Sequence, residues 1–280
     1  MSFEPHFLVN GERRNDLSLH DRSVHYGDGL FETIAVHDGK LLLWNEHFER
    51  LGAGCQRLMF PQPDKDILSS EIHSLVNDSP SAVVKIILSR GPSGRGYSPP
   101  VSPVMTRIIG LYPRPNYPQA IYTDGIELKL CQTRYSRNPL LAGIKHLNRL
   151  EQVMARAELM QHDCMEGMVL DTEDNVIEGT MSNLFMKCGR QLITPDLSHC
   201  GISGVVRKSI LEMSTSQGVD VVVKNVRMND IDRMDELFLC NSIAGIVSIN
   251  RFQNQPFESF SLADRLRHQL TASNKLVPVL

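Results

Sequence analysis

The sequence lacks the patterns that usually mark metal-binding, disulfide-bonded or membrane proteins. None of its cysteines forms a Cys-x-x-Cys pair, and its ten histidines show no zinc spacing. We therefore expect no metal and free thiols in a reducing compartment. No apolar run is long enough to span a bilayer, and residues 1–14 lack the apolar core of a signal peptide. A cytoplasmic protein is the expectation. The cysteines are Cys55, Cys131, Cys164, Cys188, Cys200 and Cys240.

The chain also lacks an excess of positive charge. Its 29 basic and 32 acidic residues give a net charge of −3, and no basic stripe is visible. Both observations argue against a nucleic-acid partner. Internal repeats and low-complexity tracts are absent as well. With 280 residues, 41% of them hydrophobic, the chain can bury one large core or two ordinary ones.

The order of periodic segments predicts a mixed α and β fold rather than a doubly wound parallel sheet. Three prolines in residues 113–118 predict a linker, since proline can continue neither a helix nor a central strand. We expect a smaller N-terminal α/β domain over 1–112 and a larger, strand-rich C-terminal domain over 119–280. Strands are predicted at 7–9, 83–88, 126–130, 219–223 and 237–240, hairpins at 32–44, 168–178 and 183–194, and helices from Asn45 to Met59 and at 64–75, 204–217 and 264–270. Asn45 is the predicted N-cap of the first helix and Met59 belongs to its predicted buried stripe, whereas Gly218 is predicted to end the helix at 204–217.

Lys145 is the first candidate for chemistry. Apolar residues at Leu147, Leu150, Val153 or Met154, and Ala157 predict one buried helical face, which would put Lys145 at or just before a helix N-terminus. A cation is disfavoured there by the helix dipole, so its pKa would fall and a neutral amine would become available. Neutral amines form Schiff bases with carbonyl compounds. The placement alone favours a solvated lysine at a loop–helix junction, so other residues must decide.

Four other stretches carry polar groups that could serve a site. Glu178 ends a predicted strand and could orient a cationic ring nitrogen or merely cap a turn. Residues 201–207 form a glycine-containing segment that leads into a predicted helix. Its backbone N–H groups could bind a phosphate, or it could be an ordinary loop. Arg90, Arg95 and Arg107 could bind carboxylates or face solvent. Residues 26–33 combine two glycines with acid and hydroxyl groups, and periodicity does not distinguish a turn from a site there.

Taken together, these motifs resemble the fold-type IV pyridoxal-phosphate enzymes, a family of aminotransferases and lyases. The resemblance runs in family order over nearly the whole chain, to about Ile249. The run from Arg137 to Val153 and the run from Ser89 to Tyr97 look most like the lyase branch. The matching motifs are Tyr26-Gly27-Asp28-Gly29, His47-Phe48-Glu49-Arg50-Leu51, Ile144-Lys145-x-x-Asn148, Glu178-Gly179-Thr180-x-Ser182-Asn183 and Gly204-Val205-Val206-Arg207.

The resemblance implies a role for particular residues. Lys145 would hold pyridoxal 5'-phosphate and move a proton, and Glu178 would pair with the pyridine nitrogen. Thr33 matches a threonine implicated in protonating the leaving enolpyruvyl group. The phosphate would be bound by Arg50, by the backbone N–H groups of Val205 and Val206, and by Ser242. The substrate carboxylates would be bound by Arg90, Arg95 and Arg107.

The implied reaction of the lyase branch converts 4-amino-4-deoxychorismate to 4-aminobenzoate and pyruvate, a step of folate biosynthesis. Two departures from the aminotransferases favour this branch: Val206 stands where they often have a threonine, and Phe31 stands where the D-amino acid branch has a tyrosine. The alternative is a branched-chain or D-amino acid aminotransferase. A third possibility is a cofactor-binding protein without catalysis, against which Thr33 and the arginines weigh. Family analogy implies a homodimer.

Overall fold

The computed structural model describes residues 6–76, 79–161 and 164–279. The chain divides into two compact units. Unit 1 holds residues 1–115 together with 144–148, and unit 2 holds 116–143 and 149–280. The division at Pro115 and Asn116 lies within the predicted linker, which forms neither helix nor strand. The segment 144–148 differs from the predicted domains, because it groups with unit 1 rather than with the C-terminal part.

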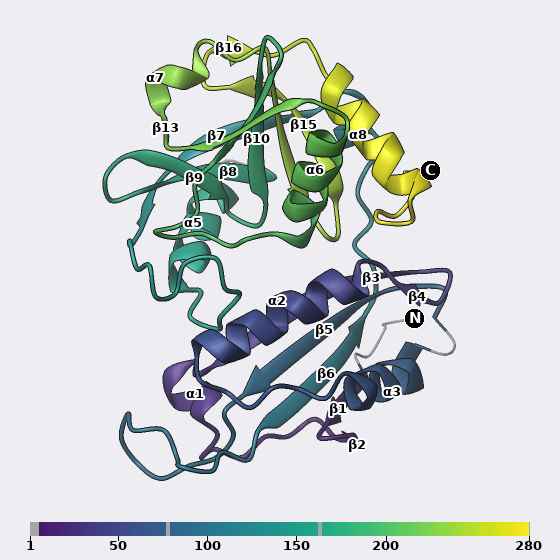
Figure 1. Cartoon of the computed structure of the whole chain (residues 1–280), viewed down its shortest axis with the longest axis vertical. Helices are drawn as coiled ribbons and strands as arrows, with labels where there is room; N and C mark the ends of the chain where they lie inside the picture. The colour runs from purple at the N-terminus through teal and green to yellow at the C-terminus, as the bar shows by residue number, and fades with distance from the viewer. Residues whose placement is uncertain (1–5, 77–78, 162–163, 280) are drawn as a thin grey trace. The chain divides into compact units, whose positions relative to one another are not determined.

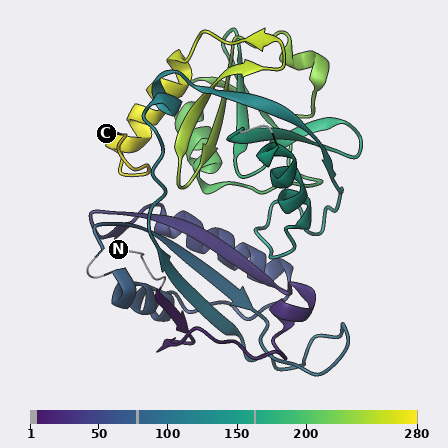
Figure 2. The same cartoon turned by 180° about the vertical axis from the view of Figure 1, so that it is seen from behind.

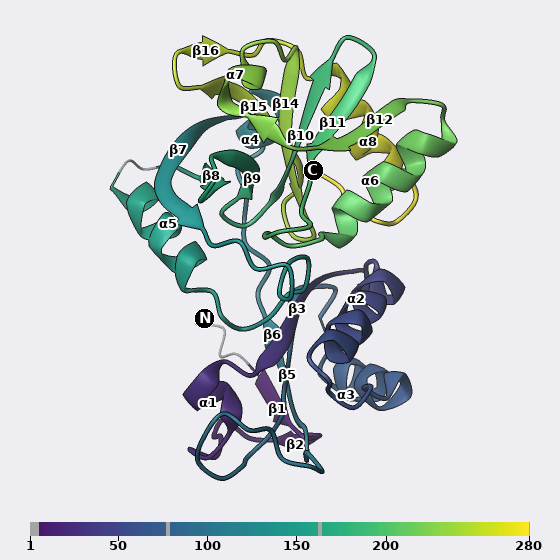
Figure 3. The same ribbon diagram turned by 60° about the vertical axis from the view of Figure 1, so that its left-hand side comes forward.

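Unit 1 is built on a six-stranded sheet in the order β2-β1-β6-β5-β3-β4, in which every neighbouring pair is antiparallel. Helices α2 and α3 lie along one face of this sheet, and in the view from behind its strands lie in front of α2 (Figures 2 and 3). The elements are β1 His6–Val9, β2 Glu12–Arg13, α1 Arg22–Tyr26, β3 Gly29–His37, β4 Lys40–Leu41, α2 Trp44–Arg57, α3 Lys65–Val76, β5 Ser81–Ser89 and β6 Thr106–Tyr112.

Unit 2 holds a ten-stranded sheet in which β12-β11-β10-β14-β15-β7-β8-β9-β13 are neighbours and β16 pairs with β15. Helix α8 contacts β15 and α5 contacts β7 and β8, as Figure 1 shows, and α6 contacts β12 and β14 (Figure 3). The elements are α4 Ala120–Thr123, β7 Ile126–Tyr135, α5 Leu150–Met160, β8 Glu166–Asp171, β9 Asn175–Gly179, β10 Asn183–Cys188, β11 Gln191–Pro195, α6 Val205–Ser216, β12 Asp220–Lys224, β13 Val226–Arg227, α7 Met228–Ile231, β14 Glu236–Asn241, β15 Gly245–Phe252, β16 Gln255–Pro256 and α8 Ser261–Ala272.

The mixed α and β class with hairpins is confirmed, and local turn chemistry explains why. Asp38 and Gly39 both adopt positive φ (49° and 72°), which is the two-residue turn that joins twisted antiparallel strands. Gly218, with φ of 71°, closes α6 as predicted. Across the described residues, no helix is long and apolar enough to cross a membrane.

Two helix predictions were wrong in detail. Helix α2 begins at Trp44 after Leu43, which takes positive φ, so Asn45 lies in the first turn and is not the N-cap. Met59 lies beyond the end of the same helix and is 77% exposed, although it was predicted in the buried stripe.

The predicted face of the helix after Lys145 is also corrected. Helix α5 begins only at Leu150, and Leu150, Val153 and Met154 are 77%, 60% and 61% exposed. Its buried face is formed by Ala155 and Leu159, which are four residues apart. The apolar spacing was real, but it marks a face that stays exposed within the described part of the chain.

Candidate active site

Lys145 lies in an extended segment and not at a helix N-terminus. Residues 145–147 pair with the start of β3: the Phe31 N–H donates to the Lys145 carbonyl at 2.9 Å, and the Leu147 N–H donates to the Gly29 carbonyl at 2.9 Å. Gly29 permits this approach, because a Cβ there would lie 2.6 Å from Leu147 Cδ1 and 2.5 Å from the Leu88 carbonyl oxygen. The expectation of a dipole-perturbed lysine therefore loses its basis, and strand pairing positions the amine instead.

The Lys145 side chain lies over Phe31, with Nζ 4.2 Å from the ring centroid. Thr33 is two residues further along β3 and so shares the face of Phe31, because side chains alternate along a strand. The structure thus brings Lys145 and Thr33 to one face of β3. Lys85, directly opposite Thr33 on β5, has its Nζ 5.5 Å from the same ring. Lys85 was not singled out from the sequence, since only cross-strand register places it here.

Arg50 is engaged on the opposite face of β3. Its Nε and NH2 groups donate to the two carboxylate oxygens of Glu32 at 2.8 and 2.5 Å, and His47 Nδ1 lies 2.6 Å from Glu32 Oε2. Burial alone would raise the pKa of Glu32, but the charge and hydrogen bonds of Arg50, followed by those of His47, lower it to about 2. Burial lowers the pKa of His47 despite the carboxylate. His47 is therefore neutral at pH 7 and donates to Glu32.

The three predicted substrate arginines have different surroundings. Arg90 is buried and donates to both oxygens of Asp28, at 2.8 and 3.1 Å. Arg107 donates to both oxygens of Glu71, the closest contact being 2.6 Å. Arg95 is exposed in the loop after β5.

Glu178 is the penultimate residue of β9 and is 4% exposed. Its Oε2 accepts from Asn183 Nδ2 and from the Ile202 N–H, both at 3.0 Å. A Cβ at Gly204 would lie 2.0 Å from Asn183 Oδ1, so glycine is required for this packing. The first and last residues of the Glu178–Asn183 motif therefore contact the loop that enters α6.

The residues predicted to bind phosphate in unit 2 lie at a helix start and in a turn. Val205 and Val206 are the first two residues of α6, whose N-cap, Gly204, supplies no capping side chain. Backbone N–H groups in a first helical turn have no partner within the helix and favour an anion. Ser242 lies in the turn after β14, where Asn241 Oδ1 accepts from the Ile243 and Ala244 N–H groups at 2.9 and 2.7 Å.

Two residues near Glu178 were missed by sequence reasoning. Tyr135 ends β7 and is 1% exposed, and its hydroxyl makes no hydrogen bond among the described residues. Burial, and then the charge of Glu178, raises the pKa of Tyr135. Burial lowers the pKa of Arg149, against the opposing charge of Glu178. The predicted strand ended at residue 130, whereas β7 continues to Tyr135. Extending the strand through the more polar residues 131–135 would have placed Tyr135 at its end.

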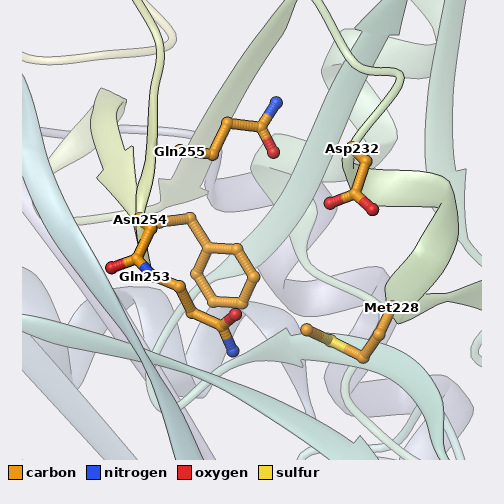
Figure 4. Close-up of a pocket in the computed structure, with 6 residues that line it drawn as sticks. Met228, Asp232, Gln253, Asn254 and Gln255 are labelled. Carbon is orange, nitrogen blue, oxygen red and sulfur yellow. The ribbon is translucent and has the colours of Figure 1, made fainter.

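A pocket of about 280 Å³ lies elsewhere in unit 2, between α7 and the turn that joins β15 to β16. Figure 4 shows Asp232 and the amide side chains of that turn around it. None of the predicted site residues lines this pocket, so we do not assign it to the reaction. Its lining residues are Met228, Asp232, Phe252, Gln253, Asn254 and Gln255.

Comparison with known proteins defines the class to which this site belongs. The model of the amino-transferase class IV family matches residues 29–252, which include the strand that carries Thr33, the Lys145 segment and the Glu178 motif. The chain belongs to this family, and the predicted fold type is confirmed. Pyridoxal 5'-phosphate is the cofactor of the family, so the cofactor prediction is confirmed as well.

Within the family, the chain shares 39–40% identity with two lyases. It is 39% identical to aminodeoxychorismate lyase of Vibrio harveyi over 247 residues, covering 87% of this chain and 90% of the relative. It superimposes on the crystal structure of 4-amino-4-deoxychorismate lyase from Pseudomonas aeruginosa with a TM-score of 0.92 and 40% identity, covering 96% of this chain and 100% of that one. Branched-chain amino acid aminotransferase of Escherichia coli shares the fold at 22% identity, with a TM-score of 0.85 over 95% of this chain and 93% of that one.

The residues of unit 2 fit pyridoxal phosphate. Glu178 is a buried carboxylate of the kind that pairs with a protonated ring nitrogen, and the buried Tyr135 hydroxyl has a hydrogen-bonding capacity that no described group uses. The uncapped start of α6 and the Ser242 turn offer N–H and hydroxyl donors of the kind a phosphate accepts.

Proposed function

We propose that this protein is a pyridoxal-phosphate lyase that converts 4-amino-4-deoxychorismate to 4-aminobenzoate and pyruvate. The observation that carries the proposal is the identity of 39–40% with two lyases of this substrate over almost the whole chain. The aminotransferase compared above shares the fold at 22% identity only. Phe31, where the D-amino acid branch has a tyrosine, and Val206, where aminotransferases often have a threonine, point the same way.

Lys145 and Thr33 are the proposed catalytic pair. The Lys145 amine would hold the cofactor, and it would take the proton from the ring carbon that bears the substrate nitrogen. The Thr33 hydroxyl gives a proton to the departing enolpyruvyl group, which becomes pyruvate while the ring becomes aromatic. Their common position on the Phe31 face of β3 supports this division of work.

The proposed cofactor site uses six groups. Lys145 binds the cofactor, and Glu178 keeps its ring nitrogen protonated. The phosphate is bound by Arg50, by the N–H groups of Val205 and Val206, and by the Ser242 hydroxyl. Bound in this way, the cofactor supplies an electron sink for the carbon that loses its proton. The Glu32 carboxylate holds the Arg50 guanidinium at Nε and NH2, which fixes its orientation.

The substrate carboxylates remain assigned to Arg90, Arg95 and Arg107 as candidates. Arg95 has an exposed side chain, whereas Arg90 and Arg107 would first have to release the carboxylates of Asp28 and Glu71. Replacing each arginine by Gln distinguishes the two roles. The substitution should raise KM at an arginine that binds substrate, and it should lower thermal stability at one that only binds Asp28 or Glu71.

The direct test is fluorescence detection of 4-aminobenzoate from enzymatically generated 4-amino-4-deoxychorismate. Wild-type protein should form product, and the Lys145→Ala variant should form almost none while staying folded. Near-normal turnover in that variant would refute the role of Lys145. If wild type with bound cofactor forms no product but converts the cofactor to its amine form on addition of an amino acid, the protein is an aminotransferase instead.

A homodimer and a cytoplasmic location are also proposed. Family analogy supports the dimer, and so does the exposed apolar face of α5 formed by Leu150, Val153, Met154 and Ala157. Sedimentation should give twice the chain mass, and Met154→Lys should shift it toward the monomer; a monomeric wild type would contradict the proposal. The location rests on the six free thiols.

A further inference from the structure

Glu166 is a buried carboxylate to which the sequence motifs assign no role. It begins β8 and is 3% exposed. Its Oε1 accepts from the Gly167 N–H at 3.0 Å, the Thr180 N–H at 2.8 Å and the Thr180 hydroxyl. Its Oε2 accepts from the Met181 N–H at 3.2 Å and from Ser182 Oγ at 2.9 Å. Five donors converge on one side chain, and four of them belong to residues 180–182.

These four donors belong to the stretch that directly follows Glu178. Thr180 and Ser182 are therefore bound to Glu166 through their hydroxyls, and the turn between β9 and β10 is wrapped around one carboxylate. Gly179 makes the space: a Cβ there would lie 3.1 Å from Glu166 Cδ and 3.2 Å from Oε2. The Gly-Thr-x-Ser part of the motif thus has a structural role: its glycine leaves space for the Glu166 side chain, and its hydroxyl groups donate hydrogen bonds to it.

The network continues from this turn to the turn that carries Ser242. Ser182 Oγ, which donates to Glu166, also accepts from Asn241 Nδ2 at 3.0 Å. Asn241 Oδ1 accepts from the Ile243 and Ala244 N–H groups and so shapes residues 241–244. One unbroken chain of hydrogen bonds joins Glu166 to the two segments that hold Glu178 and Ser242.

We propose that Glu166 is a positioning residue for the cofactor, which sets the Glu178 turn and, through Ser182 and Asn241, the Ser242 turn. It acts through these segments and is not itself a catalytic residue. The inference rests on the roles proposed above for Glu178 and Ser242.

Glu166→Gln is the sharpest variant because it preserves shape and removes one acceptor. Each carboxylate oxygen faces at least one backbone N–H, so the amide nitrogen of a glutamine must oppose an N–H whichever way the side chain turns. The turn must then shift. We expect the Kd for pyridoxal phosphate of the holoenzyme to rise about tenfold, as for the loss of a charge-assisted hydrogen bond.

The control is Glu158→Gln. Glu158, on α5, likewise accepts from two backbone N–H groups and a threonine hydroxyl, those of Gln132 and Thr133, but it has no link to either turn. Both variants should have a lower free energy of unfolding than wild type, measured by urea titration. Only Glu166→Gln should weaken cofactor retention and shift the pH midpoint of the bound cofactor's visible absorption band, in the direction caused by Glu178→Gln.

The outcomes distinguish the proposed role of Glu178 from that of Glu166. If Glu178→Gln alters neither cofactor affinity nor absorption, the proposed role of Glu178 fails. If Glu178→Gln alters both while Glu166→Gln behaves like Glu158→Gln, Glu166 is only structural and the inference is overturned. Should Glu166→Gln not fold, Ser182→Ala, which cuts the link to Asn241, and Gly179→Ala, which crowds Glu166, decide the question by the same readouts.

Discussion

At the scale of single residues, β3 separates two kinds of polar chemistry. Phe31 and Thr33 point to the face over which Lys145 lies, and Glu32 between them points to the face covered by Arg50 and His47. The alternation of side chains along the strand thus directs Thr33 and Glu32 to opposite sides of β3. Each face makes its own prediction.

Thr33→Val tests the first face. The substitution keeps the shape and β propensity of threonine and removes only the hydroxyl. Because a positioned proton donor contributes about 100-fold or more, kcat should fall by about that factor while cofactor binding stays unchanged. Steady-state kinetics and the absorption of the bound cofactor measure the two quantities. An unchanged kcat would remove Thr33 from the mechanism.

The second face predicts a pH dependence of stability. The pKa of Glu32 in the folded protein is about 2, below its ordinary value of 4.5, so its ionised form favours folding. This contribution is complete above about pH 4.5 and is lost as the pH falls toward 2. Urea unfolding at pH 6, 4 and 3 should show a steeper loss for wild type than for Glu32→Gln. Glu12→Gln, on an exposed side chain, is the control, and parallel curves for wild type and Glu32→Gln would contradict the prediction.

At the scale of elements, the position of Lys145 depends on strand pairing with β3. Gly29→Ala should disturb this pairing, because the new Cβ would lie within 2.6 Å of Leu147 Cδ1 and of the Leu88 carbonyl. We expect a loss of about 1–3 kcal/mol of stability, as for other overpacked sites. Gly94→Ala, in open space in the same unit, should be near neutral in the same urea titration. Equal stability of the two variants would show that the segment tolerates displacement.

The elements also show how far the sequence could lead. Strands and hairpins were predictable because their signals are local: Asp38-Gly39 adopts the turn its residue types favour, and apolar runs such as 83–88 lie inside β5. The candidate site motifs were found through family resemblance. The acidic partners of Arg90 and Arg107 were not predictable, because Asp28 and Glu71 reach them only through tertiary packing. Nor was the exposed side of α5, since periodicity marks an apolar face without saying whether the same chain buries it.

At the scale of the whole molecule, the cofactor should be a source of stability. A ligand that binds only the folded protein stabilises it by mass action, by about 2.7 kcal/mol at a hundred times its Kd. Removing pyridoxal phosphate should therefore lower Tm, and adding it back should restore Tm. Differential scanning calorimetry of the protein with and without pyridoxal phosphate measures this difference in Tm. In the Lys145→Ala variant, adding the cofactor should raise Tm by less than in wild type. Equal Tm values with and without bound cofactor would contradict the prediction.

The placement of segment 144–148 limits how related sequences of this family can be recombined. It packs with unit 1, yet the residues on both sides of it belong to unit 2. Recombination at the proline-rich linker would therefore transmit Lys145 with one parent's second half and its strand partner, β3, with the other parent's first half. Shuffled descendants would keep a working lysine only where these two short sequences remain compatible. A cut at the linker therefore does not divide the chain into its two units, because five residues of unit 1 lie beyond it.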